Sequence, residues 1–417
     1  MREMFADTRP LKVPAYRKLW IANILTQLGA QMTVVAVPAQ IYSLTGSSGY
    51  VGLTGLFGLV PLVLFGLYGG AIADAFDKRL VLIVSTLGMI LSSSAFFIVS
   101  MLGNANVWVL LSIFALQQAF FAVNQPTRTA TFRSILPIDQ LAAGASLNML
   151  VMQAGAVIGP LVAGALIPFI GFSWVYFLDV AFLIPTLGAV VSLPSLPPAG
   201  KVEAPGLSSI ASGLKYLWMQ PVLLMAMLLD AIAMVFGMPR ALYPEMAEVN
   251  FGGSPLMLSL LYSSIAVGAV VGGVFSGWVS RVAQQGKAVV ICITVWGGAV
   301  ALAGLFTMVS PPAVSVWAWL VVLMLVIGGA ADMFSASLRN AILQQSATAE
   351  MQGRIQGVYI IIVVGGPRIA DLAHGWAGEF MGAGLTTLIG GILVIVGTAV
   401  SMLAVPKFWR YSKPKTE

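Results

Sequence analysis

Uninterrupted apolar runs of about 20 residues recur from one end of this sequence to the other, and no other feature limits its fold as strongly. At 1.5 Å per residue, a helix of about 20 residues crosses a hydrocarbon core about 30 Å thick. Hydrophobic residues make up 59% of the chain and charged residues 9%, whereas an ordinary soluble domain is roughly 45–50% apolar. The chain is therefore predicted to be an all-α polytopic membrane protein.

Hydropathy and the positions of glycine and proline predict twelve membrane spans. They cover residues 19–44, 50–73, 80–102, 107–125, 142–168, 174–193, 220–244, 256–280, 288–309, 315–335, 355–376 and 384–405. The first span is too long and too polar for a secretory signal, so it is expected to be a retained helix.

Lysine and arginine fall on one side of this topology. If both termini are cytoplasmic, every basic residue except Arg240 and Arg368 lies in a cytoplasmic segment, including Arg128 and Arg339. This asymmetry follows the positive-inside rule and predicts a multi-pass protein of the cytoplasmic (inner) membrane.

The longest polar connection, residues 194–219, is rich in proline, glycine and serine and predicts a cytoplasmic linker. It separates an N-terminal six-helix bundle, residues 1–193, from a C-terminal six-helix bundle, residues 220–417. A shift of 211 residues places Arg128 on Arg339, which is weak evidence for a repeat. Two pseudo-symmetric bundles facing a midplane cavity are therefore expected, in a monomer.

The stretch GGAIADAFDKRL follows the second span and resembles the signature of the major facilitator superfamily. The matching residues are Gly70, Asp74, Phe76, Lys78 and Arg79. The resemblance implies the major facilitator fold, and it implies that Gly70, Asp74, Lys78 and Arg79 form a conformational switch. Ala75 stands where the signature usually has a basic residue, so part of the usual charge network is absent.

A second stretch, AGAVIGPLVAG in the fifth span, resembles the glycine-proline motif of antiporters in this superfamily. Its residues are Gly155, Gly159, Pro160 and Gly164. Small residues four apart let two helices approach closely, which is also a general device of membrane helix packing. The resemblance implies an exporter that works by antiport.

Four further words, VAVPAQIYSLTGSS, LYPEMAE, QGRIQG and SLPSLPP, are similar to the branch of the superfamily that contains the bacterial enterobactin exporter. The likeness extends over nearly the whole chain. It implies a bacterial membrane and a siderophore-like substrate.

Amide side chains form a polar stripe in the first span, because Asn23, Gln27 and Gln31 are spaced by four. Gln117 and Asn124 are similar candidates in the fourth span. Two interpretations stay open. These amides line a substrate cavity, or they form hydrogen bonds between packed helices, worth about 0.6 kcal/mol each.

Ionisable residues inside spans are costly, so they are expected to face the protein interior and to have partners. Arg368 and Asp371 share one helix face and predict a buried pair, while Asp230 is expected to meet Arg368 across a cavity. Asp371, Arg368, Asp230 and His374 are candidates for proton coupling, although the pair could instead be purely structural.

The remaining intramembrane charges are weaker signals. Arg240 offers a positive charge to an anionic substrate. Asp332 and Asp179 are weaker candidates for a functional intramembrane charge. His374 is expected near the outer membrane surface. One cysteine and one histidine exclude an internal disulfide and make a metal centre unlikely, so no metal and no cofactor are expected.

The sequence has no G-x-x-x-x-G-K-[ST] motif and no catalytic constellation, so neither an ATP-driven pump nor an enzyme is expected. Two repeated halves do not suggest a channel. The function predicted is a secondary active exporter, proton-driven by antiport, that moves a siderophore-like or other polar aromatic molecule by alternating access. The alternative is a broad-specificity multidrug/proton antiporter.

Overall fold

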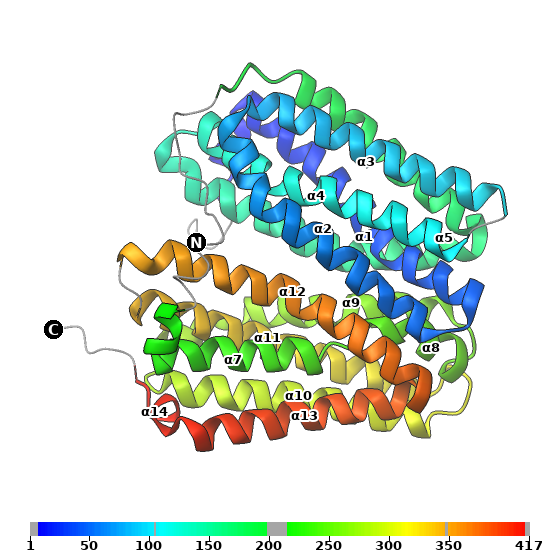
Figure 1. Ribbon diagram of the computed structural model, residues 1–417, viewed down its shortest axis with the longest axis vertical. Coiled ribbons are helices and arrows are strands. Elements are labelled where there is room, and N and C mark those ends of the chain that lie inside the picture. The colour runs from blue at the N-terminus through cyan, green and yellow to red at the C-terminus, as the bar shows by residue number, and fades with distance from the viewer. Residues whose placement is uncertain (1–6, 104–105, 198–214, 347–348, 413–417) are drawn as a thin grey trace. The chain divides into compact units, whose positions relative to one another are not determined.

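The computed structural model describes residues 7–103, 106–197, 215–346 and 349–412, with the side chains of 67–74, 278, 280, 349–354, 356–357 and 360–361 left out. The described chain is nearly all helical (Figure 1). It forms two compact units, Met1–Leu44 with Phe57–Ala204 (unit 1) and Thr45–Leu56 with Pro205–Glu417 (unit 2). The first turns of the second helix therefore belong to unit 2. The predicted domain boundaries, with a linker at 194–219, fall largely on residues outside the description and stay a prediction.

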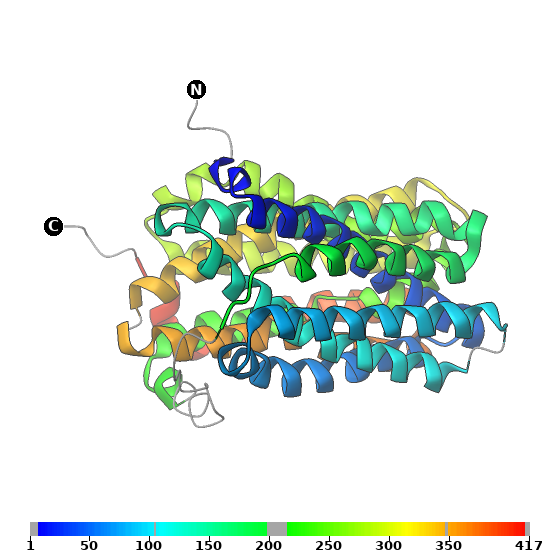
Figure 2. The ribbon, with the colours of Figure 1, turned by 90° about the horizontal axis from the view of Figure 1, so that it is seen from above.

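Unit 1 is built from long helices connected by short turns. α3 packs against both α4 and α5, as can be followed in Figure 2. The helices are α1 (Pro14–Thr45), α2 (Ser48–Ala75), α3 (Lys78–Met101), α4 (Val107–Ile135) and α5 (Leu141–Val191).

α5 covers 51 residues and contains two predicted spans. Gly171 interrupts it with φ 73° and ψ 173°, a conformation that is accessible only to glycine at low cost. The chain therefore changes direction at Gly171, and the predicted spans 142–168 and 174–193 correspond to the two legs of α5.

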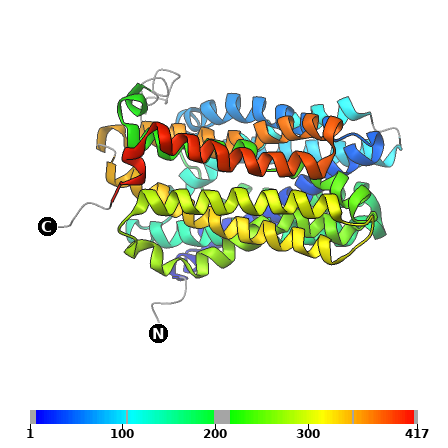
Figure 3. The same cartoon turned by 90° about the horizontal axis from the view of Figure 1, so that it is seen from below.

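Unit 2 contains a broken first helix followed by five long ones. Four of these helices pack side by side in the order α13, α10, α11 and α9, as Figure 3 shows. The elements are α7 (Pro221–Phe236), η4 (Arg240–Leu242), α8 (Tyr243–Glu245), η5 (Met246–Asn250), α9 (Pro255–Val274), α10 (Gln285–Val309), α11 (Val316–Ser346), α12 (Ala349–Met381), α13 (Ala383–Ala404) and α14 (Pro406–Trp409).

The predicted span 220–244 corresponds to the apolar segment Pro221–Asn250, but its helix is broken, because α7 ends at Phe236. Gly237 follows, and Pro239 has no backbone N–H with which to continue the ladder. Trp296 of α10 occupies the space beside the break, since a Cβ on Gly237 would lie 2.2 Å from the indole Nε1. That Nε1 donates a hydrogen bond to Ala233 O at 3.2 Å.

Ten segments of the described chain are long and apolar enough to cross a membrane. One of them, Ile138–Val191, has 54 residues and therefore has the length for two crossings of about 20 residues each. α12 has the length but is not among the ten. A polytopic helical membrane protein is thus confirmed, whereas the count of twelve crossings stays a prediction that the two legs of α5 and the length of α12 support.

Two arginines assigned to cytoplasmic segments turn out to be buried within helices. Arg128 in α4 is 1% exposed and Arg339 in α11 is 3% exposed. Each donates to the residue four positions earlier, Arg128 to Asn124 Oδ1 at 3.2 Å and Arg339 to Ser335 Oγ at 2.7 Å. The shift of 211 residues that aligns the arginines also aligns these partners, so the two units repeat a local arrangement.

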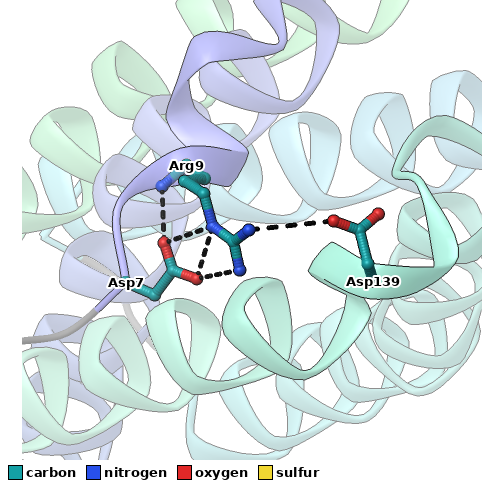
Figure 4. A network of polar contacts seen from close by, with 3 residues as sticks. All are labelled: Asp7, Arg9 and Asp139. Carbon is teal, nitrogen blue, oxygen red and sulfur yellow. Dashed lines mark hydrogen bonds and ion pairs between the residues drawn. The ribbon is translucent and has the colours of Figure 1, made fainter. Parts of the chain in front are cut away.

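Near the N-terminus of the described chain, Arg9 joins two acidic side chains on the surface of unit 1 (Figure 4). Its guanidinium contacts Asp7 at 2.7 Å and Asp139 at 3.8 Å. The hydrogen bond from Arg9 lowers the pKa of Asp7. These groups are well exposed, so the contacts organise the surface and add little stability.

Candidate transport site

The break after α7 places Arg240 next to Asp371 of α12. Arg240 Nη2 lies 2.9 Å from Asp371 Oδ2, and the side chains are 29% and 6% exposed. Arg368 lies one turn before Asp371 and interacts electrostatically with both groups. The sequence therefore identified the three charged residues, but the ion pair formed by Asp371 is with Arg240, where Arg368 was expected.

Two tyrosines complete the polar surface around this pair. The rings of Tyr243 and Tyr262 meet edge to face, with centroids 5.1 Å apart. Tyr262 donates its hydroxyl hydrogen to Arg240 O at 3.4 Å. Among the described residues, Tyr243 Oη, Arg240 Nε and Asp371 Oδ1 have no hydrogen-bond partner although they are buried. One unused donor, one unused acceptor and one hydroxyl thus gather at one place, which we call the Arg240 site.

The backbone of α12 at the Arg240 site is covered by the first turns of α2, which belong to unit 2. A Cβ on Gly55 would lie 2.2 Å from Arg368 O, and one on Gly52 would lie 2.8 Å from Asp371 O. Glycine at these positions is what lets the two helices approach so closely.

His374 lies one turn beyond Asp371 and is 5% exposed, and its position near the outer membrane surface stays a prediction. Its Nδ1 is 3.0 Å from Met238 O, a carbonyl that the break after α7 leaves without a helical partner. His374 therefore supports the break that positions Arg240.

Asp230 and Arg339 form a second buried ion pair in unit 2, and the expected contact of Asp230 with Arg368 is replaced by this one. Arg339 Nη2 lies 2.6 Å from Asp230 Oδ1 and 3.5 Å from Asp332 Oδ1. The Asp230 and Arg339 side chains are 1% and 3% exposed. Two carboxylates thus share one guanidinium, which is an arrangement suited to joining α7 and α11.

The polar stripe of α1 faces the glycine motif of α5. Asn23 Nδ2 donates to Asn148 Oδ1 at 2.7 Å. A Cβ on Gly155 would lie 3.1 Å from Gln27 Cβ, and one on Gly159 would lie 2.4 Å from Gln31 Cβ. Pro160 and Gly164 are buried in the same leg of α5. The two four-residue periodicities therefore interlock, whereas Gln27 Nε2 is buried without a hydrogen-bond partner among the described residues.

The amides of α4 are also engaged within unit 1. Gln117 Nε2 donates to Ser93 Oγ at 3.0 Å, and Asn124 Nδ2 donates to Ser85 Oγ at 2.9 Å. A substrate-lining role for these amides and for the α1 stripe stays a prediction.

The predicted switch is only partly covered by the description, because the side chains of Gly70 and Asp74 lie outside it. Lys78 N donates to Leu196 O at 3.1 Å, and Arg79 Nη2 donates to Val191 O at 2.7 Å. Asp77, between α2 and α3, is the N-cap of α3, and its side chain accepts a hydrogen bond from Arg79 N. It also accepts one from Ser195 Oγ at 2.5 Å. The Ser195 hydrogen bond lowers the pKa of Asp77. The turn after α2 is thus tied to the segment after α5.

Two helical units, a broken helix and buried charges inside membrane-crossing segments are typical of a transporter of the major facilitator type. The chain belongs to the transmembrane secretion effector family, whose sequence model matches residues 6–414. It is a transporter and not an enzyme, as predicted.

Curated relatives and solved structures agree with this family. The chain is 27% identical over 404 residues to the enterobactin exporter EntS of Citrobacter koseri, covering 96% of this chain and 94% of that one. It is 26% identical to the Escherichia coli O81 exporter of the same name, covering 92% and 91%.

Similarity to solved structures shows the fold alone. The nucleoside transporter NupG superposes with a TM-score of 0.74 at 14% identity, covering 95% of this chain and 100% of that chain. A bacterial homologue of the human lysosomal transporter Spinster gives a TM-score of 0.73 at 13% identity, covering 98% and 100%.

Proposed function

We propose that the protein is a secondary active exporter that moves a siderophore-like or other polar aromatic molecule out of a bacterial cell in exchange for protons. Similarity to proteins named enterobactin exporters along more than nine-tenths of the chain supports export and the substrate class. The proposal includes a monomer in the cytoplasmic membrane with both termini cytoplasmic.

The observation that carries the proposal is the set of unused polar atoms at the Arg240 site. A vicinal phenolic pair can donate one hydroxyl hydrogen to Asp371 Oδ1 and accept from Arg240 Nε with the neighbouring oxygen. Tyr243 Oη offers a third contact, and the edge-to-face tyrosine pair offers aromatic surface. An aromatic molecule with adjacent hydroxyls therefore complements the site better than an apolar drug does.

Asp371 also supplies a simple basis for exchange. An ionised carboxylate accepts the substrate's hydroxyl hydrogen, whereas a protonated Asp371 has lost part of that acceptor capacity. Proton and substrate then compete for one carboxylate. If the site changes its access only when one of the two is bound, each turn carries a proton one way and a substrate molecule the other. Asp230 is assigned a structural role, because Arg339 holds it on a buried ion pair shared with Asp332.

The test uses proteoliposomes of purified protein, with enterobactin as the probe and protein-free liposomes as the leak control. An acidic interior is expected to accelerate enterobactin uptake by the wild type. Asp371→Asn should abolish the acceleration by the gradient, and Glu248→Gln, which changes an exposed carboxylate, should leave it intact.

Equal uptake by the wild type with and without the gradient would refute proton exchange. Stronger gradient-driven uptake of ethidium than of enterobactin would favour the multidrug alternative and refute the substrate class.

A further inference from the structure

Among the described residues of unit 1, one buried carboxyl group, named above as a weaker candidate, has no part in the proposed function. Asp179 lies in the second leg of α5 and is 2% exposed. Its Oδ2 accepts hydrogen bonds from Ser93 Oγ at 2.7 Å, Thr33 Oγ1 at 3.2 Å and Gln117 Nε2 at 3.3 Å. Donors from α3, α1 and α4 thus converge on one oxygen atom of a fourth helical segment.

Glycine in α1 makes room for the second oxygen. A Cβ on Gly29 would lie 2.1 Å from Asp179 Oδ1 and 3.2 Å from Asp179 Cα. Any side chain at Gly29 would therefore displace the carboxyl group. The space left by Gly29 and the three hydrogen-bond donors are independent features, and both fit the carboxyl group of Asp179.

No cation faces this carboxyl group among the residues that the structure describes. The nearest arginine of α4, Arg128, is eleven residues from Gln117, about 16 Å along the helix. The basic residues of α1 and α3 lie at the far ends of those helices, about 20 Å away. The neighbouring titratable group, Tyr176 on the same leg, donates its hydroxyl hydrogen to Gln40 Oε1 at 2.8 Å.

The chemistry of the site selects a proton over a metal ion. Burial disfavours the charged carboxylate, and three neutral donors favour it, so neither form dominates through an ion pair. The three contacts to Oδ2 are direct hydrogen bonds from a side-chain hydroxyl or amide, the shortest from Ser93 Oγ at 2.7 Å. Gain or loss of a proton is the change that these contacts accommodate.

We propose that Asp179, with Thr33, Ser93 and Gln117, is a proton-binding site of unit 1, separate from the Arg240 site. Loss of the proton strengthens the three hydrogen bonds to Oδ2 and draws α1, α3 and α4 toward the second leg of α5. Protonation weakens these bonds. Its use in transport rests on the proposed function, whereas the binding of the proton does not.

Infrared difference spectroscopy of the purified protein in lipid nanodiscs tests the site without transport. A pH change in the wild type should produce a band from the C=O stretch of a protonated carboxyl group. Part of this signal should be lost in Asp179→Asn and kept in Asp371→Asn, which changes the other carboxyl group proposed to bind a proton. Equal elution on size-exclusion chromatography is the control for folding.

If Asp179→Asn fails to fold, Ser93→Ala serves as the second test, because it leaves the carboxyl group of Asp179 in place. It should move the band to higher wavenumber, because the carboxyl group loses one hydrogen-bond donor. A band unchanged in both variants would overturn the proposal. So would a band that responds to sodium chloride at fixed pH, since that result would indicate a cation site. Enterobactin transport can fail while this band is present, so the two proposals fail independently.

Discussion

Removing Asp230 should destabilise unit 2 measurably. In Asp230→Ala, the ion-pair and hydrogen-bond partners that Arg339 keeps among the described residues are Asp332 at 3.5 Å and Ser335 at 2.7 Å, and it stays buried. The lost contact is 2.6 Å long, for which the Coulomb attraction at an effective dielectric constant of 20 is about 6 kcal/mol. Relief of the desolvation of Asp230 offsets part of this attraction.

Breaking a buried ion pair from one side typically costs about 3–5 kcal/mol. Because Asp332 still compensates Arg339, we expect the lower end, about 3 kcal/mol. For a unit of this size, that corresponds to a melting temperature lower by about 6–12 °C. Asp230→Ala combined with Arg339→Met removes both charges and should be more stable than Asp230→Ala alone.

The single cysteine makes the assay local. Cys292 is buried in α10 at 9% exposure, so a thiol-reactive dye reacts with it only when unit 2 opens. Heating the detergent-solubilised variants with the dye gives the melting temperature of unit 2 directly. Glu248→Gln is the control, because its carboxylate is exposed. If Asp230→Ala melts within about 2 °C of the wild type, or if the double variant is the less stable one, the reasoning is refuted.

Three smaller changes test other contacts. The Ser195 hydrogen bond lowers the pKa of Asp77, so its stabilisation is present above the unfolded value of about 3.9 and is lost as pH falls through the lower folded value. Asp77→Ala should remove about 1 kcal/mol of capping energy, seen as faster hydrogen exchange in the first turn of α3, and unchanged exchange would contradict the cap. Gly159→Ala should cost about 1–3 kcal/mol on size-exclusion-monitored melting, with partial recovery in Gly159→Ala/Gln31→Gly; no recovery would place the strain elsewhere. Glu245→Ala should lower the melting temperature of unit 2 measured by labelling of Cys292, because Glu245 accepts a hydrogen bond from the first backbone amide of α13. An unchanged melting temperature would show that this hydrogen bond adds no stability.

Sequence alone was informative about which residues matter along each helix. Hydropathy located the helices, and depth along a span identified Arg240, Arg368 and Asp371 as intramembrane charges. It could not give their pairing, because pairing depends on how helices distant in sequence are arranged. Asp371 pairs with Arg240, which is 131 positions away, and not with Arg368 one turn earlier.

The break after α7 and the packing of α1 on α5 were indicated in the sequence by residue types and spacings that a hydropathy profile does not include. The Gly-x-Pro stretch at Gly237 and Pro239 indicated a break within the seventh span, since neither residue continues a helix well. The fit between the α1 stripe and the α5 glycines was present as two equal spacings of four. Only the packed structure shows that the two spacings face one another.

The repeat relates the arginines of the two units but not their carboxylates. Arg128 and Arg339 occupy matching positions, and each bonds a polar side chain four residues earlier. In unit 2 the arginine also binds Asp230, whereas the position matching Asp230 under the same shift is Leu19, an apolar core residue. The acid of unit 1 lies instead at Asp179, bonded to hydroxyl and amide groups only among the described residues. A neighbouring arginine favours the charged form of a carboxylate, and Asp179 lacks this contribution among the described residues. The two units therefore carry carboxyl groups of different chemistry on one shared helical plan.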